Sequence, residues 1–161
     1  MKSKQYIFSH ELPVVIACPP MKNNDNVSMM ARSASCFGLT KFILTGQNKI
    51  DPHIARDYKI EVSHHNSLLP VLKKHKSEGY QLIGLEQSSN SRPSFNYEFS
   101  EKPIVFVVGN ETKGMDIETQ ELMDVMLEIP LFAEPYSLNV AVAATVVFYE
   151  YAKQFGMEKT W

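Results

Sequence analysis

The strongest constraint on the fold of this chain is a regular alternation between short apolar runs and longer stretches with helical periodicity. The apolar runs have the length of strands and cover residues 12–18, 41–45, 80–85, 103–108 and 125–129. The helical stretches cover residues 24–37, 66–78 and 137–153, and residues 24–26 are of the types that form the N-cap of the first one. Strands that are apolar along their whole length are buried on both faces, which is typical of a parallel sheet between helices. The sequence therefore predicts an α/β fold with a mainly parallel sheet, in which ligands bind beyond the carboxyl ends of the strands.

The bulk properties of the chain favour one globular domain over residues 1–161, with 44% hydrophobic and 21% charged residues. No apolar run approaches the roughly 18 residues that a membrane span needs. The first residues also lack the apolar stretch of a secretion signal. We therefore expect a cytoplasmic protein with no membrane partner.

The cysteines and histidines predict neither a disulfide framework nor a metal site. Cys18 and Cys36 form neither a close pair nor a regularly spaced series, which fits a reducing compartment. The five histidines include no pair at i and i+4 and no neighbouring cysteine that would complete a zinc site. We expect no metal.

The net charge of −2 and the pI near 6.2 argue against a protein that holds nucleic acid by bulk charge. A local basic patch remains open, although lysines on a helix are more often a solvated face. The candidates for such a patch are Lys73, Lys74 and Lys76, Arg56 and Lys59, and Arg92.

The last predicted helix carries no charged residue between positions 140 and 149. A helix that is apolar on all sides must bury more than one face. We therefore expect this helix to pack on the sheet and also against another surface, such as a second copy of the chain.

The first helical stretch presents one polar side chain with a possible function. Arg32 lies about 140° around the helix from Val27, away from the apolar positions, at roughly 100° per residue. A guanidinium in this position can hold an RNA phosphate or ribose through its fixed set of donors. The alternative is a solvated arginine on an ordinary helix.

The loop after the most apolar run, residues 109–116, has a glycine spacing that imitates a phosphate-binding P-loop. However, Met115 and Asp116 stand where a P-loop needs lysine and serine or threonine, and Glu111 would repel a triphosphate. ATP and GTP chemistry is therefore disfavoured. The sulfonium and polar edges of S-adenosylmethionine suit the backbone groups of a tight glycine turn better, and a plain turn is the alternative.

The segment around the start of the last helix contains two polar side chains. Ser137 is of the residue type that caps helices, which explains the serine fully. Asn139 is a poor helix former that we expect one turn into an otherwise apolar helix. A buried asparagine needs hydrogen-bond partners, which favours a functional role.

Taken in this order, residues 26–38, 104–114 and 129–143 resemble the three sequence motifs of the SpoU/TrmH family of the SPOUT superfamily. Residues 84–87 also resemble a loop of the members that act on tRNA. The resemblance implies transfer of a methyl group from S-adenosylmethionine to a ribose 2′-hydroxyl of RNA, with tRNA as the first expected substrate and rRNA as the second. It further implies a deep trefoil knot at the C-terminal end and a homodimer whose paired sites share residues.

The same resemblance assigns roles to ten residues. Catalysis is assigned to Arg32, supported by Asn26, Glu111, Ser137 and Asn139. Cofactor binding is assigned to Leu85, Glu86, Gly109, Ile129 and Leu138. Because arginine is effectively always protonated, we expect Arg32 to bind phosphate and the developing oxyanion, with Glu111 holding its guanidinium.

Two positions depart from the family pattern. Ser28 stands where the family usually has glycine, and Thr112 follows Glu111 where glycine is common. We expect the serine to narrow the approach of RNA slightly. A non-catalytic RNA-binding member of this fold and an unrelated doubly wound nucleotide-binding domain are the alternative interpretations.

Overall fold

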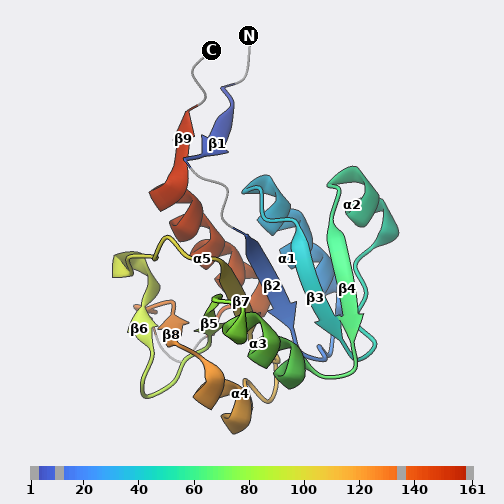
Figure 1. Cartoon of the computed structure of the whole chain (residues 1–161), viewed down its shortest axis with the longest axis vertical. Coiled ribbons are helices and arrows are strands. Elements are labelled where there is room, and N and C mark those ends of the chain that lie inside the picture. Colours follow the sequence, from blue (N-terminus) through green and yellow to red (C-terminus); the bar gives the residue numbers. More distant parts are fainter. Residues whose placement is uncertain (1–3, 10–12, 134–136, 159–161) are drawn as a thin grey trace.

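The computed structural model describes residues 4–9, 13–133 and 137–158 (Figure 1). Within them, seven strands form one sheet in the order β4-β3-β2-β7-β5-β8-β6, and every pair of neighbours is parallel. The strands are β2 (Val14–Cys18), β3 (Lys41–Thr45), β4 (Glu61–His65), β5 (Gln81–Leu85), β6 (Arg92–Pro93), β7 (Ile104–Val108) and β8 (Val125–Glu128). The predicted α/β fold with a mainly parallel sheet is confirmed.

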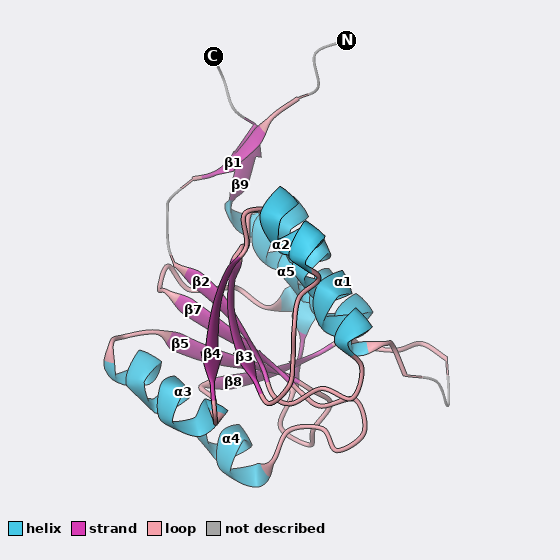
Figure 2. Ribbon diagram, turned by 90° about the vertical axis from the view of Figure 1, so that its right-hand side faces the viewer, coloured by secondary structure: helices cyan, strands magenta, loops and turns pink. Residues whose placement is uncertain are grey.

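Helices cover both faces of this sheet, as Figure 2 shows. Helices α1, α2 and α5 lie on one face, and α3 and α4 lie on the other. Their bounds are α1 (Asn24–Cys36), α2 (Pro52–Asp57), α3 (Leu68–Ser77), α4 (Ile117–Leu122) and α5 (Val140–Phe155), with a short 3₁₀ helix at Ser94–Asn96. The alternation of side chains along β2 divides the core between the two faces. Val14, Ile16 and Cys18 pack in the cluster under α1 and α5, whereas Val15 and Ala17 pack in the cluster on the opposite face.

A separate two-stranded ribbon extends from the end of α5, at the top of Figure 1. Strands β1 (Tyr6–Phe8) and β9 (Gly156–Glu158) pair antiparallel, and Lys4 forms an ion pair with Glu158 at 3.0 Å. This ribbon brings segments from both ends of the chain together. Nothing in the apolar pattern predicts it, because both strands are short and largely exposed.

Helix α5 packs on the sheet as predicted, and it leaves a second apolar face open. Its buried side chains include Phe148 and Tyr151, while Val142, Val146 and Tyr149 are 43%, 36% and 53% exposed.

No helix among the described residues is long and apolar enough to cross a membrane. The expected knot depends on the path of the chain between β8 and α5, which includes residues 134–136 and so lies partly outside the described residues.

Candidate active site

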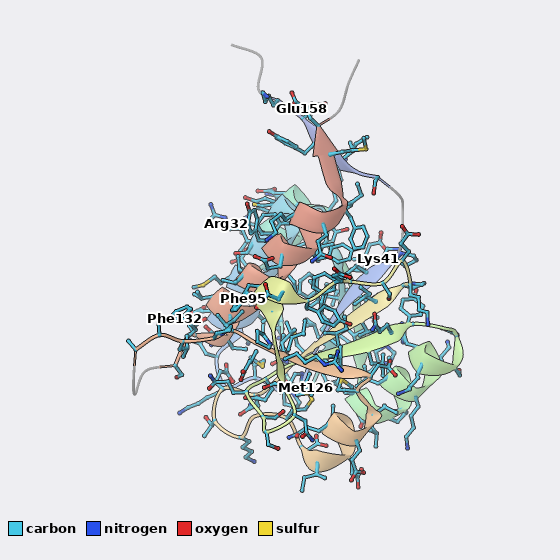
Figure 3. All side chains as sticks on the ribbon, turned by 90° about the vertical axis from the view of Figure 1, so that its left-hand side faces the viewer. Arg32, Lys41, Phe95, Met126, Phe132 and Glu158 are labelled. Carbon is cyan, nitrogen blue, oxygen red and sulfur yellow. The ribbon has the colours of Figure 1, made fainter. Side chains whose placement is uncertain are left out.

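A pocket of about 450 Å³ opens at the carboxyl ends of β5, β7 and β8, beside the N-terminal half of α5. This is the edge of a parallel sheet where ligands are expected to bind. Nine of the ten residues predicted for the site line it: Asn26, Leu85, Glu86, Gly109, Glu111, Ile129, Ser137, Leu138 and Asn139. The tenth, Arg32, is exposed on the outer side of α1 and points away from the body of the molecule in Figure 3.

One wall of the pocket is a chain of hydrogen bonds between three predicted site residues. The Asn139 side-chain amide donates to Asn26 Oδ1 at 2.8 Å, and the Asn26 amide donates to Glu111 Oε1 at 3.0 Å. These residues come from the start of α5, from α1 and from the loop after β7. The chain of bonds therefore fixes three segments that are distant in sequence against one another, and we call it the polar wall.

The Glu111 carboxylate in the polar wall also holds the loop between β2 and α1. It accepts from the backbone N–H of Lys22 at 2.9 Å and from that of Asn23 at 3.2 Å. Partial burial raises the pKa of this carboxyl, but the hydrogen bonds from Lys22, Asn26 and Asn23 outweigh that effect and lower it. Among the described residues, no contact joins Glu111 to Arg32, so the expected grip on the guanidinium is absent within one chain.

Two predictions about helix caps are wrong. Asn139 is itself the N-cap of α5, and its side-chain oxygen accepts from Ala141 N at 2.8 Å and Val142 N at 3.4 Å. Ser137 therefore precedes the cap, and Asn139 is exposed rather than buried one turn into the helix. Helix α1 is capped by Asn23, whose side chain accepts from Asp25 N, not by one of residues 24–26. In both cases an asparagine oxygen satisfies N–H groups that the first turn leaves unpaired.

The predicted tight glycine turn is present in the loop after β7. Asn110 and Gly114 exchange two backbone hydrogen bonds of 3.0 and 2.9 Å, and Gly114 has a φ of +66°. The Asn110 side-chain oxygen accepts from the backbone N–H of Thr112 and of Lys113, each at 2.9 Å. Sequence reasoning missed Asn110 as a site residue, although an asparagine directly after Gly109 is a common signal for such a turn.

A second part of the pocket lining combines apolar side chains with one carboxylate. Glu86 follows β5, and its carboxylate lies directly over Gly109, so that a Cβ at this glycine would collide with it. Burial raises the pKa of Glu86, and the backbone N–H of Gln87 partly offsets this. Leu85, Ile129 and Leu138 supply the apolar surface of this side. Because these are the residues predicted to bind the cofactor, we call this part of the lining the cofactor wall.

The sequence matches the SpoU rRNA Methylase family over residues 13–149, which is most of the chain. The chain belongs to this family. The resemblance inferred from the three motifs is thereby confirmed.

Relatives of this SpoU family protein include RNA methyltransferases of very different lengths. The tRNA (guanosine(18)-2′-O)-methyltransferase of Aquifex aeolicus is 27% identical and matches 94% of this chain and 74% of its own length. The mouse tRNA (guanosine(18)-2′-O)-methyltransferase TARBP1 is 36% identical over 89 residues, which are 55% of this chain but 6% of the mouse protein. The chain thus spans only a small part of some relatives.

Solved structures of the SpoU family share the fold. The TrmH/SpoU tRNA modifying enzyme of A. aeolicus superposes with a TM-score of 0.80 at 25% identity, covering 91% of this chain and 77% of that one. An AdoMet-bound rRNA methyltransferase from Sinorhizobium meliloti superposes with a TM-score of 0.76 at 22% identity, covering 92% and 58%. The second likeness concerns the fold alone.

The two departures from the SpoU pattern have local structural roles. The Ser28 hydroxyl accepts from the backbone N–H of Asp51 at 2.9 Å, which attaches α1 to the start of α2. Its hydroxyl is therefore engaged within the protein, and the expected narrowing of the RNA approach stays a prediction. Thr112 is exposed, and its N–H takes part in the Asn110 turn.

Proposed function

We propose that this chain is an S-adenosylmethionine-dependent RNA methyltransferase that methylates a ribose 2′-hydroxyl. The observation that carries the proposal is the polar wall, in which Asn26, Glu111 and Asn139 are joined at the edge of a pocket that also contains the predicted cofactor residues. Membership of the SpoU family and the predicted motif roles support the same reaction.

The residues of the cofactor wall fit S-adenosylmethionine. Leu85, Ile129 and Leu138 offer apolar surface for an adenine ring, and the missing side chain of Gly109 leaves room for the Glu86 carboxylate beside them. The Glu86 carboxylate can accept hydrogen bonds from ribose hydroxyls or face the positive sulfonium. When bound, the cofactor supplies a methyl group activated by the sulfonium.

The remaining task of the protein is to align the 2′-oxygen and help its proton leave. Methyl transfer of this kind is an in-line displacement, so the position of the ribose decides the rate. We assign this positioning to the polar wall together with Ser137. Arg32 binds phosphate and stabilises the developing oxyanion, because its guanidinium is a fixed set of donors without a base function.

A homodimer would bring Arg32 to an active site. Met29 lies one turn before Arg32 on α1 and is 47% exposed, near the open face of α5 formed by Val142, Val146 and Tyr149. Burial of these side chains against a second copy would carry Arg32 toward the pocket of that copy. Mixing Arg32→Ala with Asn139→Asp tests this, because heterodimers would then hold one intact site and restore about a quarter of normal activity. Absence of rescue in confirmed heterodimers would contradict shared sites.

We propose tRNA as the first substrate class, because the A. aeolicus relative that matches most of this chain is named for tRNA, and rRNA as the second. We propose a cytoplasmic location for the protein. The test is transfer of labelled methyl from S-adenosylmethionine to total tRNA and, separately, to rRNA, followed by nucleoside mass spectrometry. A 2′-O-methylated nucleoside is the expected product. Cofactor binding without transfer to either RNA would contradict the proposal.

A further inference from the structure

Three loops at the carboxyl ends of β2, β3 and β7 are joined into one unit beside the pocket. The Asn48 side-chain amide donates to Pro19 O at 2.6 Å, and its oxygen accepts from Met21 N at 2.9 Å. On the other side, the Asn110 amide donates to Pro20 O at 2.7 Å. The loop after β2 therefore lies between the other two and is bonded to both.

Each of these loops carries one exposed lysine: Lys22, Lys49 and Lys113. The side chains are free, but the backbone N–H of each lysine donates to a side-chain oxygen of the same unit, at 2.9, 3.0 and 2.9 Å. The acceptors are Glu111 for Lys22, Asn24 for Lys49 and Asn110 for Lys113. The backbone at each lysine is thus fixed before any ligand arrives, which lowers the ordering cost of binding.

The ammonium groups of these three lysines have no carboxylate partner within the described ranges, in contrast to four lysines elsewhere. The paired lysines are Lys4, Lys74, Lys76 and Lys153. Three of the carboxylates on or next to the three loops are engaged by N–H donors: Asp51 caps α2, Asp116 caps α4 and Glu111 holds residues 22 and 23. A fourth, Asp25, is exposed in the first turn of α1. Three positive charges therefore remain available on one rigid surface of an otherwise acidic chain.

The position of the lysines relative to the pocket indicates their ligand. Asn110 and Glu111 line the active-site pocket, whereas Lys113 on the same loop lines a second cavity of about 770 Å³ together with Pro19 and Pro20. A strand that leaves the pocket across this loop would pass Lys113 on its way to the second cavity, and Lys22 and Lys49 lie on the adjoining loops of the same unit. We propose that Lys22, Lys49 and Lys113 bind backbone phosphates of the RNA strand that flanks the target nucleotide, a surface we call the lysine rail.

This proposal rests on the proposed RNA substrate but not on the chemistry of methyl transfer. Lysines act as point charges on phosphates, which positions the strand without reading its bases. A chain with net negative charge repels RNA over most of its surface, so a local rail determines where the strand lies. The lysine rail therefore contributes to RNA affinity and KM, whereas kcat depends on the residues of the pocket.

The test compares two triple variants with the same change in charge. The rail variant is Lys22→Gln/Lys49→Gln/Lys113→Gln. The control is Lys41→Gln/Lys73→Gln/Lys102→Gln, three exposed lysines that also form no ion pair among the described residues and lie away from the three loops. Because Lys73 belongs to one of the basic patches that the sequence left open, this variant also tests that alternative. Binding of fluorescein-labelled total tRNA is followed by anisotropy as a function of salt, alongside the melting temperature and the affinity for S-adenosylhomocysteine.

We expect the slope of log affinity against log salt to fall in magnitude by about 2 to 3 in the rail variant, since each phosphate contact contributes roughly 0.7–0.9. The affinity at about 0.1 M salt should fall at least tenfold, while cofactor affinity and melting temperature stay as in the control. Equal slopes in the two triple variants would overturn the lysine rail. If the rail and control variants differ in salt slope but the native protein transfers no methyl group, the lysine rail is supported and the proposed reaction is rejected. Failure of the rail and failure of the proposed function therefore give different results.

Discussion

The two walls of the active-site pocket each carry one glutamate, and the surroundings shift the two carboxyl groups in opposite directions. Glu111 in the polar wall accepts hydrogen bonds from two backbone N–H groups and from Asn26, and its pKa is lowered. Glu86 in the cofactor wall is half-buried over Gly109, and its pKa is raised. The polar wall is thus completed within the protein itself, whereas the Glu86 charge in the cofactor wall is compensated in part, by the backbone N–H of Gln87. This difference fits a rigid RNA-positioning side and a side that awaits a cationic ligand.

The largest effect is expected from Gly109→Ala in the cofactor wall. A Cβ at this position collides with the Glu86 carboxylate and lies 3.4 Å from the carbonyl carbon of Gly114. The carboxylate must therefore leave the position in which it lines the pocket. We expect affinity for S-adenosylhomocysteine, measured by calorimetry, to fall by about 100-fold or more. Gly79→Ala, at an open position with a φ of +91°, controls for general destabilisation. Unchanged cofactor affinity in Gly109→Ala would show that the cofactor does not use this wall.

The polar wall can be broken without removing the cap of α5. Asn139→Asp keeps an oxygen that accepts from Ala141 and Val142 but loses the donor to Asn26 Oδ1, whereas Asn139→Ala loses both functions. We expect Asn139→Asp to lower kcat about tenfold to 100-fold with little change in cofactor affinity. Asn139→Ala should in addition lower the free energy of unfolding by about 1–2 kcal/mol. Equal kcat values for Asn139→Asp and the native protein would exclude a positioning role of the wall.

The opposite pKa shifts of the two glutamates predict opposite dependence of stability on pH. Glu111 has a pKa below its ordinary value of 4.5, so its contribution is present above pH 4.5 and is lost as the pH falls through the lowered value. Glu86 has a raised pKa, so its ionisation destabilises the fold as the pH rises from 4.5 through the raised value. In Glu111→Gln, the melting temperature should therefore fall less steeply as the pH drops below 4.5. In Glu86→Gln, the decrease in melting temperature between pH 4.5 and neutral pH should disappear. Melting temperatures that change with pH in the same way in both variants would contradict the opposite pKa shifts of the two glutamates.

Sequence reasoning recovered the parts of the fold that depend on local patterns. Strand β3 matches its predicted range, because an apolar run of strand length leaves few alternatives. Strand β4, with the sequence EVSHH, was missed because it is a polar edge strand, and the six-residue helices α2 and α4 are too short to show a period. These elements are defined by pairing and capping partners that no local pattern reveals.

The site was predicted through the resemblance, and what it left out depends on tertiary contacts. Asn26, Glu111 and Asn139, which the motifs assign to one site, do line the same pocket. The hydrogen bonds between them join positions up to 113 residues apart, which no local pattern shows. For the same reason the sequence could not show that Asn48 ties two loops together. Arg32, to which the resemblance assigns catalysis, lies outside the pocket of its own chain, so a motif can assign a role to a residue without giving its place in the fold.

The smallest effect is expected from Ser28→Ala, outside both walls. The Ser28 hydroxyl accepts from Asp51 N at 2.9 Å, so its loss should lower the free energy of unfolding by about 0.5–1.5 kcal/mol. Asp51 caps α2 and is not one of the residues of the polar wall. We therefore expect kcat and KM for RNA to remain within about twofold of the native values. Ser33→Ala, on the same helix and without a side-chain hydrogen bond among the described residues, is the matched control for thermal denaturation and methyl transfer. A gain in RNA affinity in Ser28→Ala but not in Ser33→Ala would mean that this serine does restrict the approach of RNA, and that the polar wall is only part of the RNA-facing surface.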